Sequence, residues 1–224
     1  MVSVDTVYQR VLAILNKENR GYITPQEFNL MANQAQLEIF EQYFYDLNQF
    51  NRVGYNNSEY ADIINNIEEK ISIFEVTENL ITDNLFHTTP ENLYRVGSIV
   101  EGNVEVCYVS EKELQAINAS PLTTPTTTYP VYTKKGTSIY VYPYASSISI
   151  NYIKIPNTVQ WAYSEINSVA LYDSSNSINF ELHESDEPNL VIKILSYAGL
   201  SIKQPEITQV AQSIDNKKIT QEKS

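Results

Sequence analysis

The sequence is poor in the residue types on which most catalytic and metal sites depend. It contains one cysteine, two histidines and six glycines in 224 residues. A single cysteine, Cys107, excludes an internal disulfide and any metal site with several cysteine ligands. We expect Cys107 to be a buried structural thiol, because it lies in the apolar strand pattern VEVCYV. With so few glycines there is little capacity for phosphate-binding loops, and no GxGxxG, GxSxG or Walker A motif is present.

Positive charge and long hydrophobic runs are also scarce. The chain has 15 Lys and Arg against 27 Asp and Glu, a net charge of −12. Nucleic-acid binders without sequence preference need clustered cations, and a surface this acidic suits only a channel through which DNA slides without sticking. No apolar run reaches the length of a membrane-spanning helix, so we expect no membrane partner. The N-terminal residues lack the pattern of a secretory signal, which predicts synthesis in the cytoplasm.

Uncharged polar residues and tyrosine are abundant instead. There are 17 tyrosines but only one tryptophan, Trp161. Tyrosine combines a large apolar ring with a polar tip and is enriched at protein–protein interfaces. It is equally common in β-strands, so both interpretations stay open at this point.

The first third of the chain is predicted to be helical. Ile23-Thr24-Pro25-Gln26-Glu27-Phe28 carries four start signals: a Thr24 cap, Pro25 at the first helical position, a capping box to Glu27, and a hydrophobic staple. The helix that follows is expected to run to about Phe50, with a wide apolar stripe that needs more than one packing partner; the stripe comprises Phe28, Met31, Ala35, Ile39, Tyr43, Leu30, Leu37, Phe40, Phe44 and Leu47. Before it, a helix capped by Ser3, with Val4, Val7, Val11, Ile14 and Leu15 on one face, is expected to stop at Gly21, and a third helix starts at about Ser58.

The middle of the chain is predicted to be an antiparallel sheet with one solvated face. Alternating strands flank turn signals at residues 101–103 and 134–136, and a further strand ends before Pro156. Ser110 and Glu113 form a second capping box, which opens a short helix to about Asn118. The Pro- and Thr-rich stretch from Ser120 to Pro130 is expected to be extended and unpaired.

The last part reads as mixed structure. A strand-like FEL precedes a helix entered through residues 186–188 and stopped by Gly199, with Leu190, Ile194, Leu195 and Ala198 on its buried face. A further helix is expected from Pro205 to about Ile214, before a frayed tail. The predicted fold class is α+β, in three parts: helical residues 1–86, antiparallel β residues 87–160 with the arm at 120–130, and a mixed part at 161–224.

Candidate chemistry is limited to one group of carboxylates, at Glu181, Glu184, Asp186 and Glu187. They could form a glycosidase-like acid and base pair or a calcium site. The favoured alternative is that Asp186 and Glu187 complement the positive N-terminus of the following helix. His87 and His183 lie in no zinc-binding spacing, and pairing of either with Cys107 as a nucleophile is disfavoured. We therefore expect no cofactor, no metal and no enzymatic activity.

Two runs of the sequence carry a family resemblance. The first is VYQRVLAILNKENRGYITPQEFNLMANQAQLEIFEQYFYDLN. The second is SPLTTPTTTYPVYTKKGTSIYVYP, followed by NYIKIPNTVQW and then by FEL and a helix, so that the two runs are distributed over most of the chain. They resemble the neck and tail ring proteins of short-tailed phages, the crAss-like phages of Bacteroidota in particular. The resemblance implies a head-to-tail adaptor that is located in the virion, assembles as a ring of about twelve copies, and links the portal protein to adjacent tail ring or nozzle proteins. Genomic DNA would pass through its lumen without specific binding.

A ring subunit needs surfaces that contact its neighbours. The candidate contact elements are the long helix, the 120–130 arm and the C-terminal tail, and the candidate contact residues are Phe40, Tyr43, Phe44, Pro121, Pro125, Tyr129, Tyr132 and Ile214. Two other functions stay open. One is a tyrosine-rich module that binds glycans, although Trp161 follows a strand and is expected to anchor the core. The other is a cell-wall hydrolase that uses two of the carboxylates between residues 181 and 187.

Overall fold

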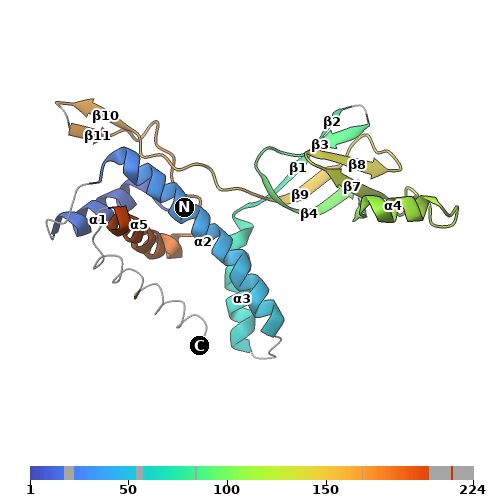
Figure 1. Ribbon diagram of the computed structural model, residues 1–224, viewed down its shortest axis with the longest axis horizontal. Helices are drawn as coiled ribbons and strands as arrows, with labels where there is room; N and C mark the ends of the chain where they lie inside the picture. Colours follow the sequence, from blue (N-terminus) through green and yellow to red (C-terminus); the bar gives the residue numbers. More distant parts are fainter. Residues whose placement is uncertain (18–22, 54–57, 84, 168, 202–212, 214–224) are drawn as a thin grey trace. The chain divides into compact units, whose positions relative to one another are not determined.

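The computed structural model describes residues 1–17, 23–53, 58–83, 85–167, 169–201 and 213 (Figure 1). The chain forms two compact units. The first, here called the helical unit, combines Met1–Ile73 with Pro156–Ser224; the second, the β unit, is Phe74–Ile155. The α+β class is therefore confirmed. In place of the three parts expected from the sequence, the two ends of the chain share one unit, and the inserted β unit begins at Phe74 rather than at residue 87.

The helical unit contains α1 (Val4–Lys17), α2 (Pro25–Val53), α3 (Ser58–Ser72), the short 3-10 helix η1 (Glu184–Asp186) and α5 (Glu187–Ser201). The predicted start of α2 is confirmed: the Thr24 amide donates to the Glu27 carboxylate at 2.9 Å, and the Glu27 amide donates to the Thr24 hydroxyl at 3.3 Å. The staple residues Ile23 and Phe28 are both buried. Local signals of this kind fix the helix start because all partners lie within one turn.

The helices pack through α2, which contacts both α3 and α5, while α1 packs against α5. Their core consists of the predicted stripes of α1, α2 and α5, including Val4, Val7, Val11, Leu15, Phe28, Ala35, Ile39, Phe40, Phe44, Leu190, Ile194, Leu195 and Ala198. Three predicted core positions, Ile14, Leu30 and Leu37, are instead exposed, because the partners of these helices cover a narrower stripe than the sequence suggested. Gly199 does not stop α5, which continues to Ser201. The proposed stop at Gly21 and the helix from Pro205 to Ile214 lie outside the described residues.

An extended segment, residues 157–161, lies along α2 and is held by side-chain amides; we call it the strap. Asn33 donates to the Val159 carbonyl at 2.9 Å and accepts from the Val159 amide at 2.8 Å, and Asn29 makes the same pair of bonds with Trp161. Gln36 donates to the Asn157 carbonyl at 2.8 Å. Four residues of an α-helix span about 6.0 Å along its axis, and two residues of an extended segment span about 6.6 Å. One side-chain amide per turn of α2 can therefore bond to every second residue of the strap.

A two-stranded hairpin follows the strap. Strands β10 (Tyr163–Ile166) and β11 (Val169–Tyr172) are antiparallel, with Tyr163 opposite Tyr172 and Ile166 opposite Val169. The buried Trp161 ring stacks on both tyrosines, at 5.8 Å from Tyr163 and 5.7 Å from Tyr172. The expectation that Trp161 anchors the core is thus confirmed. The sequence analysis did not identify this hairpin.

The β unit consists of two sheets. The first has the order β1-β9-β4-β5 and the second β2-β3-β8-β7-β6. Their strands are β1 (Glu75–Asn79), β2 (Ile81–Asp83), β3 (Phe86–Thr88), β4 (Leu93–Glu101), β5 (Val104–Glu105), β6 (Cys107–Tyr108), β7 (Val131–Lys135), β8 (Ser138–Tyr142) and β9 (Ser149–Lys154), with helix α4 (Glu111–Asn118) after β6. All pairings are antiparallel except that of β6 with β7.

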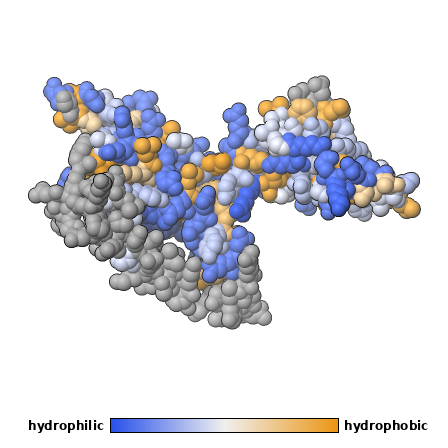
Figure 2. All heavy atoms as spheres, viewed as in Figure 1, coloured by the Kyte–Doolittle hydropathy of each residue, from blue (hydrophilic) through white to orange (hydrophobic). Residues whose placement is uncertain are grey.

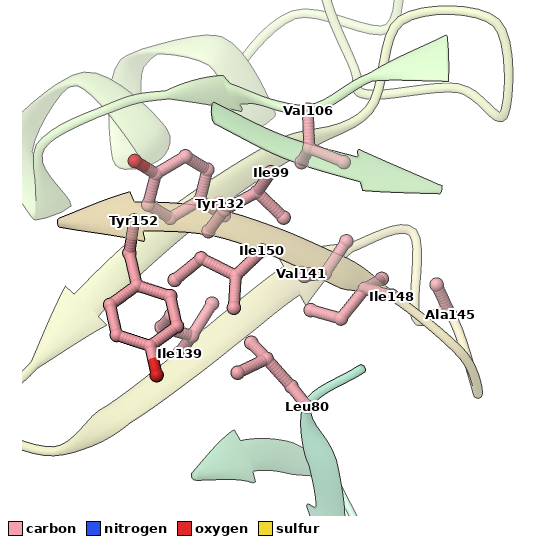
Figure 3. Packing of buried hydrophobic residues seen from close by; sticks show 10 residues of the cluster. All are labelled: Leu80, Ile99, Val106, Tyr132, Ile139, Val141, Ala145, Ile148, Ile150 and Tyr152. Carbon is pink, nitrogen blue, oxygen red and sulfur yellow. The ribbon is translucent and has the colours of Figure 1, made fainter. Parts of the chain in front are cut away.

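Side chains from both sheets fill the core of the β unit (Figure 3). The cluster comprises Leu80, Ile99, Val106, Tyr132, Ile139, Val141, Ala145, Ile148, Ile150 and Tyr152. At one point the two central strands β4 and β9 approach closely: a Cβ added to Gly97 would lie 2.9 Å from the Asn151 carbonyl oxygen. Gly97 sits at a shift in the β4–β9 register, where a side chain has no room.

The predicted hairpins and the helix between them are confirmed. Gly102 and Gly136 occupy the turns with φ of 60° and 59°, a backbone region that favours glycine. The capping box of α4 is present, with the Ser110 amide donating to Glu113 at 2.8 Å. The arm differs from the prediction: residues 120–130 form turns rather than an extended, unpaired segment, because threonine hydroxyls bond to nearby carbonyls.

Candidate interaction surfaces

Each of the four clustered carboxylates has its own partner. Glu181 accepts from the backbone amide and the side chain of Asn157, at 2.9 and 2.8 Å. Glu184 lies 3.7 Å from the amino group of Met1, and Glu187 pairs with Arg10 at 2.8 Å. The arrangement ties together the strap, the N-terminus and the start of α5.

Asp186 is buried at the junction of three helices. It accepts hydrogen bonds from the Tyr43 hydroxyl at 2.7 Å, from the Lys70 ammonium group at 3.1 Å and from the side-chain amide of Asn189 at 3.1 Å. Burial, followed by the negative charge of Asp186, raises the pKa of Tyr43 far above its ordinary value, so the phenol stays protonated and donates. Asp186 thus joins α2, α3 and α5 through one buried charge, next to the positively polarised start of α5.

His87 and Cys107 belong to the β unit, whereas the four carboxylates belong to the helical unit. His87 is buried, and its Nε2 lies 2.9 Å from the Ala145 carbonyl, to which it donates. Burial lowers the pKa of His87. The prediction of a buried Cys107 is wrong: this thiol is exposed, because β6 is a two-residue strand at the edge of its sheet.

The candidate contact residues on α2 lie in the interior. Phe40, Tyr43 and Phe44 are buried, and the Phe40 and Phe44 rings meet edge to face at 5.1 Å. Tyr132, in the β unit, is buried in the core cluster. In this conformation none of the four can contact a second protein. Their aromatic character is explained by packing within the chain.

The candidates in the 120–130 arm are accessible. Tyr129 is 79% exposed and Leu122 is 96% exposed, while Pro121 is exposed and Pro125 half-buried. The arm is held close to α4 by its own hydrogen bonds, such as that from the Thr123 hydroxyl to the Ile117 carbonyl at 2.7 Å. It therefore presents apolar side chains from an ordered loop. The remaining candidate, Ile214, lies outside the described residues.

A second apolar surface, on the β10–β11 hairpin, was missed by the sequence analysis. Its outer face carries Ile166, Val169 and Leu171, which are 54%, 58% and 46% exposed. In Figure 2, hydrophobic residues reach the surface at this end of the helical unit. The sequence contains little signal for it: YSEI and VALY are four-residue runs separated by Asn-Ser, and neither alternates between apolar and polar residues.

Other kinds of site have little support in the part of the chain that the structure describes. Among the described residues, no group of three His, Cys, Asp or Glu side chains is arranged to hold a metal ion. No described helix is both long and apolar enough to cross a membrane. The arm and the hairpin, each with several exposed apolar side chains, are the candidate interaction surfaces.

Comparison with known proteins adds no further constraint. No protein-family model matches the chain, and a search of curated proteins finds no match.

Proposed function

We propose that this chain is a structural subunit of an oligomeric ring in the neck or tail of a phage particle. In this role it binds copies of itself, links the portal protein to the adjacent tail ring or nozzle proteins, and lines the channel through which DNA passes. The proposal includes no catalytic step, cofactor or metal. Its starting point is the resemblance of the two sequence runs to phage ring proteins.

The observation that carries the proposal is the presence of a separate exposed apolar surface on each unit. The hairpin presents Ile166, Val169 and Leu171, and the arm presents Leu122 and Tyr129. Exposed apolar side chains that gather on one face, as the register places them on the hairpin, commonly mark interaction sites. A ring subunit contacts a neighbour on each flank, so it needs at least two such surfaces.

The charge of the chain fits the same role. A net charge of −12 repels the phosphate backbone, so DNA could pass through a lumen of such subunits without being retained. The acidic residues that interact with cations include Glu38 and Glu111, which pair with Lys193 and Lys135. These pairs reduce the positive charge available to hold DNA.

Recognition of a glycan by the β unit is the second candidate. Tyr108 and Tyr129 are both exposed, and exposed aromatic rings are suited to stacking on sugars. Under this hypothesis Tyr129→Ala abolishes glycan binding but leaves assembly intact. The hydrolase hypothesis has less support, because the carboxylates between residues 181 and 187 are each engaged by different cationic or amide groups.

The decisive experiment is quantitative mass spectrometry of gradient-purified particles, in which this chain is counted against the portal protein. A ratio near one, or a small whole-number multiple, is the expected result for a ring on the portal axis. Absence of the chain from purified particles would overturn the proposal and redirect attention to glycan-binding and hydrolase assays.

A further inference from the structure

The β10–β11 hairpin has two strand edges without a strand partner among the described residues. It forms a sheet of only two strands, and no other strand or bridge is paired to residues 163–172. Isolated two-stranded hairpins are marginally stable in water and gain stability when further strands are added. This hairpin is supported on one face by Trp161, and its opposite face exposes the side chains of Ile166, Val169 and Leu171.

The hydrogen-bonding groups on these edges can be identified from the register. The Asp173 amide donates to the Ala162 carbonyl at 2.9 Å, so residues 162 and 173 form a hydrogen-bonded pair. Such pairs alternate along an antiparallel ladder, so the next pair, Tyr163 with Tyr172, directs its backbone groups outward. By the same alternation, Glu165 on β10 and Ala170 on β11 also direct their amide and carbonyl groups outward.

These outward groups are complementary between two copies of the hairpin. Placing β11 of one copy beside β10 of the next, antiparallel and without stagger, brings Tyr172 opposite Tyr163 and Ala170 opposite Glu165. All four residues then exchange backbone hydrogen bonds, and the aliphatic faces of both copies lie on the same side of the extended sheet. The pairing repeats the register already present within the hairpin.

Charge favours this arrangement over the symmetrical ones. Strand β11 contains no charged residue and no proline, so its edge lacks the features by which proteins normally block strand addition. Pairing β10 with β10 could bring Glu165 near its own copy in a chain that already carries a charge of −12. Pairing β11 with β10 places Glu165 opposite the small, neutral Ala170 and satisfies both edges.

We propose that the β10–β11 hairpin joins neighbouring copies of this chain by head-to-tail strand addition, β11 of one copy to β10 of the next. The contact is heterologous, so it can repeat around a closed ring and leave no free edge. Two four-residue strands bury less than the roughly 800 Å² per partner of a standard interface, so further contacts must contribute. The inference rests on the proposed self-association of the chain and identifies the element that carries it.

Disulfide trapping between two singly substituted variants tests the pairing. In the proposed contact Ser164 and Leu171 of adjacent copies form a non-hydrogen-bonded pair, with Cα atoms about 4.5 Å apart, which a disulfide can span. The full-length chain would carry Cys107→Ser with either Ser164→Cys or Leu171→Cys. The two proteins are mixed in equal amounts and oxidised, and dimers are analysed by non-reducing electrophoresis and peptide mass spectrometry.

The expected result is a 164–171 disulfide dimer in the mixture, containing up to about half of the chains if copies assort randomly around a ring. Neither variant alone should form a dimer above background. A matched control replaces Leu171→Cys with Leu30→Cys, an exposed position on α2 in the same unit.

Three results would overturn the proposal. They are no dimer in the mixture, a dimer formed by Leu171→Cys alone, which indicates symmetrical β11 pairing, and equal dimer with the Leu30→Cys control. Each leaves the particle count by mass spectrometry unaffected. Failure of this inference is therefore distinguishable from failure of the proposed function.

Discussion

Replacing Asn33 by alanine should destabilise the helical unit strongly, because this side chain satisfies both backbone groups of Val159. The substitution removes the two hydrogen bonds to Val159, of 2.9 and 2.8 Å, and a third to the Asn29 carbonyl, of 2.7 Å. It leaves the amide and carbonyl of the buried Val159 without their partners. Each buried backbone group left without its partner costs about 1–3 kcal/mol, so the two groups of Val159 together cost about 2–6 kcal/mol. Part of this cost is recovered, about 0.5 kcal/mol, because alanine is the better helix former.

The expected net effect is a loss of about 2–5 kcal/mol in the free energy of unfolding of the helical unit. Urea unfolding followed by fluorescence measures it, since the single tryptophan, Trp161, lies in the strap itself. With a typical denaturant dependence of about 1–3 kcal/mol/M, the midpoint should fall by ~1 M or more. Asn33→Asp keeps the acceptor for the Val159 amide and loses the donor, so its effect should be intermediate.

Asn48, which is exposed on the same helix, supplies the matched control. Asn48→Ala changes the same residue type on α2 without touching the strap, and should alter stability by less than about 0.5 kcal/mol. If Asn33→Ala proved as mild as Asn48→Ala, the strap would not depend on side-chain amides. The account of how it is attached to α2 would then be refuted.

Three further predictions concern the β unit. Gly97→Ala should lower its stability by about 1–3 kcal/mol in thermal unfolding, because the added methyl would lie 2.9 Å from the Asn151 carbonyl oxygen; an unchanged midpoint would contradict the close approach. Burial lowers the pKa of His87 below its ordinary value of 6.5, so as the pH falls below 6.5 the unfolded chain binds more protons than the folded chain. The stability that the neutral ring contributes should therefore be complete above pH 6.5 and should decrease as the pH falls toward the lower pKa of the folded state. Urea midpoints at pH 7.5 and 5.5 should therefore differ more for the native chain than for His87→Gln, and equal differences would exclude the buried neutral ring. Finally, the exposed Cys107 should react fully with a thiol reagent in the absence of denaturant; a requirement for urea would show that the thiol is covered.

Features that depend on neighbouring residues were predicted well from the sequence. The capping boxes at Thr24 and Ser110 and the glycine turns at Gly102 and Gly136 all appear where the sequence placed them. In each case the interacting groups lie within a few residues of each other. Their geometry is therefore determined by the local sequence and does not depend on how the rest of the chain folds.

Features that depend on distant residues could not be predicted. Asn33 and Val159 are 126 positions apart, and nothing in a helix with polar residues one turn apart specifies that an extended segment will bind there. The exposure of Cys107 depends on β6 being an edge strand, which is a property of the whole sheet. Likewise, the sequence alone predicts Phe40 and Phe44 to be contact residues, because it does not show that α5, more than 140 positions later, packs against α2.

The two candidate surfaces also differ in how well the sequence predicted them. The arm was identified from its composition, and its exposed Leu122 and Tyr129 keep it a candidate, although its backbone forms turns. The hairpin was difficult to identify from YSEI-NS-VALY, because neither run alternates between apolar and polar residues and Asn-Ser is not one of the usual two-residue hairpin turns. The lack of a strand partner at its edges, within the part of the chain that the structure describes, could not be predicted either, because it depends on how the rest of the chain folds.

The chain enters and leaves the β unit at adjacent points. The Lys154 amide donates to the Phe74 carbonyl at 2.9 Å, so the first residue of the insertion is hydrogen-bonded to its last residue but one. Closely spaced ends allow a segment to be transplanted or exchanged without stretching the host. A short linker from Ile73 to Pro156 should therefore be able to replace residues 74–155 and connect the two segments of the helical unit directly. Residues 74–155 could equally be exchanged for another domain, in evolution or by design, without changing the sequence of the helical unit.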